Sequence, residues 1–180
     1  MDQVVQHSSK TDAWGTPPWL LDMVREVLGP IDFDPCSSSE FNKNVQAKRF
    51  YSHGGEFEPW PEVESIFINP PGERRPRGQS LPGLFWQRLM KQYHEAKFGH
   101  AIWLGFSLEQ LRTTQEYAFD GDSLLDFPFC IPKKRIRFVD ENGNPGKSPT
   151  HANVIGYIPS NIDETCKFHE VFSRLGKVRV

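Results

Sequence analysis

The sequence predicts an α/β fold, a three-layer sandwich whose sheet is mainly parallel, with an antiparallel hairpin late in the chain. Two observations support this prediction. Helical and strand-like patterns alternate along the chain, and the runs over 66–68 and 101–106 are largely apolar, as expected for strands buried on both faces. With 180 residues, 37% of them hydrophobic, the chain is also long enough to bury one real core.

Composition and charge predict one domain over residues 13–180, preceded by a flexible lead-in over residues 1–12. The net charge of −2 gives no overall attraction to nucleic acid, so such binding must come from local basic patches. The three cysteines form neither a zinc-type pair nor an even disulfide framework, and the histidines have no ligand spacing. Since there is also no signal peptide and no membrane-spanning apolar run, we expect a cytoplasmic protein without a metal or a membrane segment.

The first third of the chain predicts one helix and one strand. Thr16 is the expected N-cap and Pro17 the first helical position, and Gly29 ends the helix after an apolar face. Residues 31–34 alternate with period two, which predicts a strand ending at Asp34, where a carboxylate suits the hydroxyls and amines of a ligand. Residues 40–62 are interrupted by Asn, Gly and Pro, so we expect no regular element there.

The middle of the chain predicts a helix, a strand and a second helix. The first helix is expected to begin at Pro82 and to end at about Phe98, because apolar residues recur there with helical spacing. The strand over 101–106 follows. Ser107 and Gln110 then match a capping box, which predicts a helix that ends at about Tyr117.

The last third predicts the hairpin and a final helix. A strand region over 124–131 and a strand over 152–158 are joined by a long, turn-rich loop, which is the pattern of a long-looped hairpin. Ser160 is the expected cap of the last helix, and Gly176 is expected to close it.

The most informative stretch is Asn69-Pro70-Pro71-Gly72, directly after the buried run over 66–68. The prolines end that strand because neither can donate a ladder hydrogen bond. Asn69 is therefore expected in a rigid turn at the carboxyl end of a strand, where open α/β sheets bind their ligands. This predicts an active site at Asn69, and a purely structural turn is the simpler alternative.

Two basic clusters accompany this stretch. One follows it directly in a loop that contains Gly and Pro, and the other precedes the turn-rich loop of the hairpin. Arginine forks suit phosphate groups, so we expect phosphate contacts or a lid there, with a solvated loop as the alternative. The clusters consist of Arg74, Arg75 and Arg77, and of Lys134, Arg135 and Arg137.

Taken in order, these features resemble the phage-type DNA N-6-adenine methyltransferases, the small Dam-type enzymes of phages and prophages. The resemblance covers most of the chain and rests on four segments. The Asn-Pro-Pro element is the specific one, and the others gain weight from their order. The segments are the Thr16-Pro17 turn with its helix, Asp32-Phe33-Asp34-Pro35-Cys36, the strand that leads to Pro71, and residues 134–138.

The resemblance implies a trimmed, Rossmann-like methyltransferase fold that binds S-adenosylmethionine and methylates the N6 amine of adenine in DNA, with the base flipped out of the duplex. Asn69 and the carbonyl of Pro70, held rigidly with Pro71, would accept the two N–H groups of that amine. The basic clusters would contact DNA phosphates. The residues assigned to the cofactor are Thr16, Pro17, Asp34 and Cys36.

This sequence departs from the family pattern at two points. Gly72 replaces the aromatic residue that normally stacks on the flipped base, and Trp86 and Phe106 are the candidates to substitute for it. No glycine-rich cofactor loop follows the first strand, and the roughly 30 residues between Asp34 and the Asn-Pro-Pro strand are too few for two βα units. A trimmed sheet is therefore expected.

Three functions remain open from the sequence. The first is a phage-encoded adenine methyltransferase that marks DNA or protects it from host restriction. The second keeps the chemistry but changes the acceptor to a modified base or a protein amide. The third is a non-catalytic DNA-binding or anti-restriction protein on the same fold. His151 and Asn153 could approach the substrate, although structural roles are the simpler interpretation.

Overall fold

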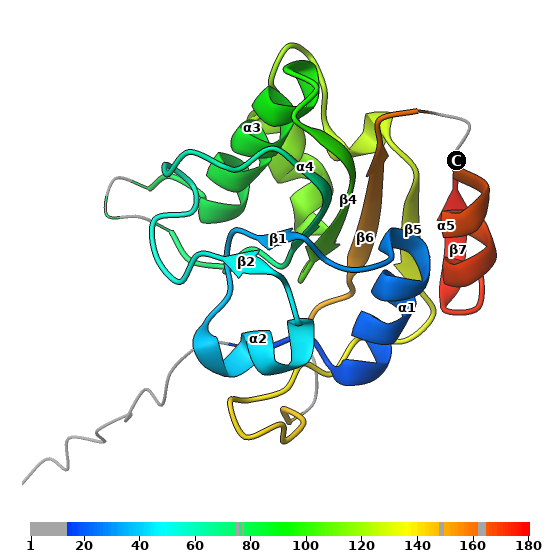
Figure 1. Ribbon diagram of the computed structural model, residues 1–180. Helices are drawn as coiled ribbons and strands as arrows, with labels where there is room; N and C mark the ends of the chain where they lie inside the picture. The colour runs from blue at the N-terminus through cyan, green and yellow to red at the C-terminus, as the bar shows by residue number, and fades with distance from the viewer. Residues whose placement is uncertain (1–13, 75, 77, 148–149, 162–164) are drawn as a thin grey trace, which may run out of the picture.

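The computed structural model describes residues 14–74, 76, 78–147, 150–161 and 165–180, so the predicted lead-in over residues 1–12 lies outside them. A seven-stranded sheet with the strand order β2-β1-β3-β4-β6-β5-β7 forms the middle layer (Figure 1). The strands are β1 (Phe33–Asp34), β2 (Arg49–Phe50), β3 (Val63–Ile68), β4 (Phe98–Gly105), β5 (Phe129–Pro132), β6 (Val154–Pro159) and β7 (Gly176–Arg179).

The sheet is mixed, which corrects the expectation of a mainly parallel one. The neighbours β2, β1, β3 and β4 run parallel, as predicted. The pairs β4–β6, β5–β6 and β5–β7 are antiparallel, so one half of the sheet is parallel and the other antiparallel. The predicted late hairpin is present as the β5–β6 pair, and β7 extends it at the edge.

Helices cover both faces of this sheet, which confirms the three-layer α/β architecture (Figure 1). Helices α1 and α5 contact each other over one face, and α3 and α4 contact each other over the opposite face. The helices are α1 (Pro18–Leu28), α2 (Ser39–Val45), α3 (Leu81–His94), α4 (Glu109–Glu116) and α5 (Thr165–Phe172), with a short 3-10 helix η1 at Leu124–Asp126.

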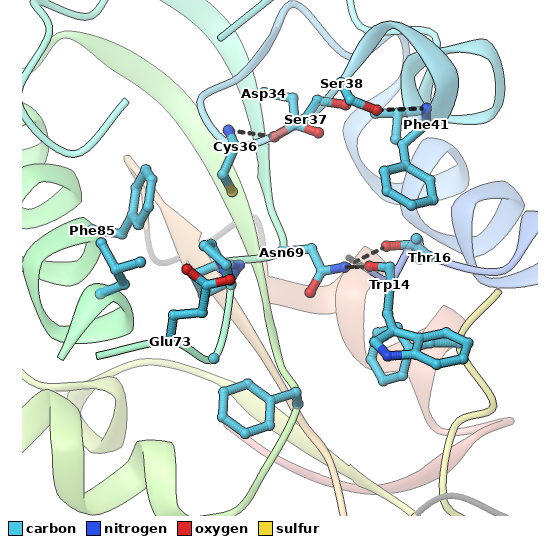
Figure 2. A pocket seen from close by; sticks show the side chains of 18 of the residues that line it. Trp14, Thr16, Asp34, Cys36, Ser37, Ser38, Phe41, Asn69, Glu73 and Phe85 are labelled. Carbon is cyan, nitrogen blue, oxygen red and sulfur yellow. Dashed lines mark hydrogen bonds between the residues drawn. The ribbon is translucent and has the colours of Figure 1, made fainter. Parts of the chain in front are cut away.

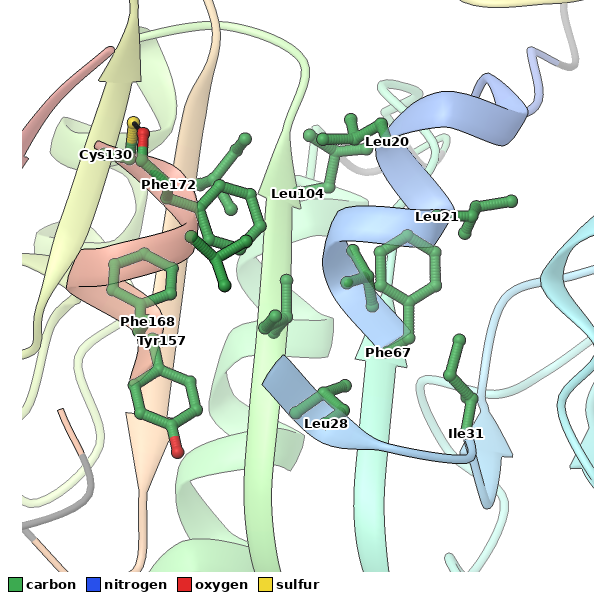
Figure 3. Close-up of a cluster of buried hydrophobic side chains, with 14 of the residues drawn as sticks. Leu20, Leu21, Leu28, Ile31, Phe67, Leu104, Cys130, Tyr157, Phe168 and Phe172 are labelled. Carbon is green, nitrogen blue, oxygen red and sulfur yellow. Dashed lines mark hydrogen bonds between the residues drawn. The ribbon is translucent and has the colours of Figure 1, made fainter. Parts of the chain in front are cut away.

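The central strands are buried on both faces, as their apolar sequences predict. On β3, Phe67 packs under α1 (Figure 3), whereas Ile66 and Ile68 pack on the opposite face, with α3. On β4, Ile102 and Trp103 alternate in the same way. Side chains of a strand point alternately to its two faces, and each fully buried one stabilises the fold by roughly 1.5–3 kcal/mol.

The stretch over 40–62 is more regular than its composition predicts. It contains most of α2 and the two-residue strand β2, which pairs with β1. Helix α2 begins after Ser38, whose hydroxyl accepts the Phe41 N–H at 3.1 Å. One helix and one short strand, α2 and β2, therefore lie between Asp34 and β3. This agrees with the trimmed sheet that the short spacing predicts.

Several element ends differ from the prediction. Helix α3 ends at His94, before Phe98, because Ala96 adopts a left-handed conformation (φ 52°) and β4 begins at Phe98. The region expected as one strand over 124–131 is η1 followed by β5. Gly176 does not close a helix but begins β7.

The predicted caps also differ. The N-cap of α1 is Pro17 rather than Thr16, and the N-cap of α4 is Leu108, so Ser107 and Gln110 do not form the predicted capping box. The Gln110 side chain instead accepts a hydrogen bond from the Trp103 indole N–H at 2.8 Å. Helix α5 is described from Thr165 onward; its predicted cap at Ser160 cannot be compared with it, because residues 162–164 between them lie outside the described residues.

Candidate functional site

Three strand ends meet at one edge of the sheet. Strands β1, β3 and β4 are parallel, so their carboxyl ends lie side by side, with Asp34 ending β1, Asn69 following β3 and Phe106 following β4. All three residues line one cavity of about 1000 Å³, which we call the strand-end cavity. Ligand sites in α/β sheets lie at this edge, and the volume suits a ligand of cofactor size.

Asn69 is anchored through its amide nitrogen. The Nδ2 atom donates to the Thr16 hydroxyl at 3.2 Å and to the Trp14 carbonyl at 3.5 Å (Figure 2). Among the described residues, none donates a hydrogen bond to the Asn69 Oδ1 atom. Pro70 and Pro71 also line the strand-end cavity. The side chain is thus held in one orientation, with its oxygen available as an acceptor.

Thr16 reaches this site because its hydroxyl is not used as a helix cap. It is buried, it lines the strand-end cavity, and its hydroxyl meets Asn69 instead. Pro17 is also buried, but it lies behind Thr16 and does not line the cavity; its carbonyl accepts the N–H groups of Leu20 and Leu21 at the start of α1. Of the Thr16-Pro17 pair that was expected to border the cofactor pocket, only Thr16 lines the strand-end cavity.

Asp34 is the buried ionisable group at the end of β1. Its carboxyl is 2% exposed and accepts the backbone N–H of Cys36 at 3.0 Å. Burial raises the pKa of Asp34 to about 7, against the opposing effect of hydrogen bonds from Cys36 and Ser37. A buried carboxylate of this kind favours a ligand that brings hydrogen-bond donors or positive charge.

Cys36 connects the ends of β1 and β3. Its thiol lies beside the Asp34 carboxyl and the backbone N–H of Asn69. Burial and the Asp34 charge raise the pKa of the Cys36 thiol well above its ordinary value, so the group stays protonated. Cys36 lines the strand-end cavity as a neutral, polarisable wall rather than as a nucleophile.

A glycine pair occupies the side of the strand-end cavity next to β1. Gly54 has a positive φ of 70°, and a Cβ on Gly55 would lie 1.8 Å from the carbonyl oxygen of Pro35, so the loop after β2 can approach β1 only with glycine at position 55. Both glycines line the cavity. The sequence lacks a glycine-rich loop directly after β1, and this glycine pair comes later in the chain, after β2.

Further lining residues were not among the sequence-predicted site residues. Ser37 and Ser38 (Figure 2) directly precede α2, with Ser38 as its N-cap, and Glu56 is buried beside the glycine pair. Glu73 and Lys147 lie on loops around the cavity. The serines after the strand-end aspartate and the Gly-Gly pair can be recognised in the sequence as features typical of a ligand site. Glu73 and Lys147 carry no such signal, because only the fold brings their loops to the cavity.

Only part of the two predicted basic clusters lies at the strand-end cavity. Arg137 lines the strand-end cavity, whereas Lys134 and Arg135 are exposed on the same segment and do not line it. Arg74 is exposed in the loop after Gly72. Arg75 and Arg77 lie outside the described residues.

Trp86 does not belong to the site. Its ring is 0% exposed, packs against Trp103 in the core under α3, and donates its indole N–H to the Asp122 carbonyl at 3.1 Å. The prediction that Trp86 contacts the substrate is therefore wrong, because helix α3 turns this position towards the sheet. Phe106, the other candidate aromatic, lines the cavity.

Asn153 has a structural role. Its Oδ1 atom accepts the Ile136 N–H at 2.8 Å, and its Nδ2 atom donates to the carbonyls of Gly105 and Phe106 at 3.4 and 3.1 Å. It thereby joins the end of β4 to the loop that carries Arg137. His151 is exposed at the cavity, with its ring edge-on to Phe106.

No family model matches this chain, and no curated protein or solved structure gives a significant match. Across the described ranges, no three His, Cys, Asp or Glu side chains gather in a way that could hold a metal ion. No helix of the described chain is long and apolar enough to cross a membrane. The geometry of the strand-end cavity therefore carries the functional proposal.

Proposed function

We propose that the protein is an S-adenosylmethionine-dependent methyltransferase that acts on the exocyclic N6 amine of adenine in DNA. The observation that carries this proposal is the anchoring of Asn69. Thr16 and the Trp14 carbonyl hold its Nδ2 atom, which leaves Oδ1 as a fixed acceptor at the carboxyl end of β3. The resemblance of the sequence to phage-type adenine methyltransferases agrees with this arrangement.

The chemistry that Asn69 suits is the activation of a poor amine nucleophile. The lone pair of an exocyclic amine is delocalised into the ring, so the amine attacks an electrophile slowly. Two acceptors that bind both of its N–H groups favour a tetrahedral nitrogen and free the lone pair for attack. Asn69 Oδ1 and the Pro70 carbonyl supply such a pair, and the proline backbone fixes them before the reaction begins.

The cofactor fits the residues at the end of β1. S-adenosylmethionine, when bound, supplies an electrophilic methyl group on a sulfonium. Asp34 would hold a polar part of it, because the buried carboxyl prefers hydroxyl or ammonium partners over an empty apolar environment. Cys36 and Thr16 border the same space, and the glycine pair Gly54-Gly55 leaves room for it.

DNA would reach the cavity from the side of its basic residues. Arg137 and Lys147 both line the strand-end cavity and are exposed, so they are placed to contact phosphates beside a base that enters it. A base inside a duplex must first be flipped out to reach Asn69. In a phage or prophage, such an activity would mark DNA or protect it from restriction.

The proposal is tested by methyl transfer from isotopically labelled S-adenosylmethionine to DNA that lacks adenine methylation. Mass spectrometry of the digested nucleosides is expected to show labelled N6-methyladenine. Label in protein but not in DNA would instead indicate an amide acceptor. Cofactor binding without transfer to DNA or protein would favour a non-catalytic DNA-binding protein, and either result would reject the proposed function.

A further inference from the structure

The position after the Asn-Pro-Pro turn is an exposed glycine, and an aromatic ring lies beside it. A Cβ added to Gly72 would lie 3.0 Å from two ring carbons of Phe106 and 3.5 Å from a third. The Gly72 backbone conformation does not itself require glycine, because its φ is not positive. A side chain at position 72 would therefore press against the ring of Phe106, which would have to shift by a few tenths of an ångström, whereas glycine leaves the ring in place.

Phe106 is held at this place from two sides. Asn153 donates to its backbone carbonyl at 3.1 Å, which fixes the chain where β4 ends. The ring of His151 approaches its ring edge-on, with centroids 6.2 Å apart and planes at 78°. The Phe106 side chain is only half-buried, and it lines the same cavity as Asn69. An aromatic surface thus faces the cavity next to the amine acceptors.

We propose that Phe106 is the stacking surface for the acceptor base, and that the acceptor is a flipped-out planar heterocycle rather than a protein amide. This inference rests on the proposed function, because it names the substrate class of the same site. Stacking on an aromatic side chain strengthens the binding of a base whatever the sequence, whereas a glutamine amide offers a much smaller planar surface to the ring. His151 and Asn153 act as positioning residues for the Phe106 ring.

The first test compares the binding of a short single-stranded oligo(dA) with the binding of an abasic oligonucleotide of the same length. Both probes offer the same phosphates, so the difference in affinity reports the bases. We expect the wild type to prefer oligo(dA), Phe106→Tyr to keep that preference, and Phe106→Leu to reduce it about ten- to hundredfold. Affinity for S-adenosylmethionine should stay unchanged in both variants.

Phe119→Leu is the matched control. Phe119 is also a half-buried phenylalanine beside a histidine ring, with its centroid 5.8 Å from that of His94, but it does not line the strand-end cavity. This variant loses the same atoms at a distant site, and its oligo(dA) preference should equal that of the wild type. An equal loss in Phe119→Leu and Phe106→Leu would overturn the inference, since the effect would then be one of stability.

A swap of the aromatic position gives the second test. In Phe106→Ala the space beside Gly72 is vacant, so the double variant Gly72→Tyr/Phe106→Ala can place a ring there from the neighbouring strand end. We expect the double variant to regain methyl transfer and oligo(dA) preference that Phe106→Ala lacks. Loss in both variants, or full activity of Phe106→Ala, would overturn the inference. A wild type that prefers oligo(dA) but transfers no methyl group would reject the proposed function alone.

Discussion

The ends of β1 and β3 have the same layout and opposite chemistry. Strand β1 ends at Asp34 and strand β3 is followed directly by Asn69, and in both cases the next residue is proline, Pro35 or Pro70. Asp34 is ionisable and almost fully buried, with the backbone N–H of Cys36 as its donor. Asn69 is neutral and half-buried, and Thr16 and Trp14 fix its amide nitrogen.

Because of this difference, the two strand ends suit different tasks within the same cavity. A buried carboxyl that has hydrogen-bond donors but no cationic partner favours a donor-rich or cationic ligand, and its effect changes with pH. A fixed neutral amide offers the same acceptor at every pH and costs little to bury. The end of β1 is therefore suited to hold the cofactor, and the end of β3 is suited to act on an uncharged amine.

The largest expected effect comes from removing the acceptor at the end of β3. Asn69→Ala should lower the methyl-transfer rate on the order of a hundredfold or more, because a preorganised electrostatic contact to the reacting group is lost. Cofactor affinity, measured by calorimetry, should change little. A variant that loses cofactor binding and transfer to the same extent would contradict the separation of the two strand ends.

The end of β1 should show its role through pH. In the unfolded chain Asp34 loses its proton at about pH 4, whereas in the folded protein it keeps the proton up to about pH 7. Its contribution to stability therefore falls as the pH rises from about 4 to 7 and is constant above that. Asp34→Asn should raise the free energy of unfolding at pH 8 by up to about 4 kcal/mol and have no effect below about pH 4.

The same substitution should act in the opposite direction on binding. The ionised carboxylate is the better partner for hydroxyl or ammonium groups, so wild-type affinity for S-adenosylmethionine should increase as the pH rises through about 7. Asp34→Asn should bind more weakly and lose this pH dependence. Calorimetry across this pH range measures it, and an equally pH-dependent Asp34→Asn variant would contradict the role of Asp34.

Thr16→Val should give a smaller effect, because it removes only one anchor of Asn69. The Trp14 carbonyl remains as a partner for Nδ2 at 3.5 Å. One hydrogen bond contributes about 0.5–1.5 kcal/mol, so we expect a decrease of up to about tenfold in methyl transfer. Thr113→Val is a suitable control, since the Thr113 hydroxyl bonds the Glu109 carbonyl within α4. Equal decreases in both variants would exclude a specific effect at Asn69.

The smallest effects should come from the basic rim of the cavity. Arg137→Ala and Lys147→Ala should each weaken DNA binding uniformly across sequences and reduce the slope of log affinity against log salt by about one. Lys177→Ala, an exposed change on β7 at the other edge of the sheet, should leave the slope unchanged. Unchanged slopes in the Arg137 and Lys147 variants would place the DNA elsewhere.

The sequence predicted the parts that depend on local pattern. Apolar runs identified β3 and β4, and the Asn-Pro-Pro turn after β3 identified Asn69. The burial of Trp86 was not predictable, because the spacing of apolar residues in a helix does not show which of its aromatic side chains packs against the sheet. The approach of Gly54-Gly55 to Pro35 and of Phe106 to Gly72 depends on pairing between distant segments, which no local pattern contains.

The most direct measurement is a crystal structure with S-adenosylhomocysteine bound. The division of tasks predicts the ligand in the strand-end cavity, with a polar group on the Asp34 carboxyl and its sulfur facing the side of the cavity where Asn69 Oδ1 lies. Asn69 should still donate to Thr16. A ligand bound outside this cavity, or an Asn69 oxygen turned away from the sulfur, would contradict the proposal that the end of β1 holds the cofactor and the end of β3 holds the amine acceptor.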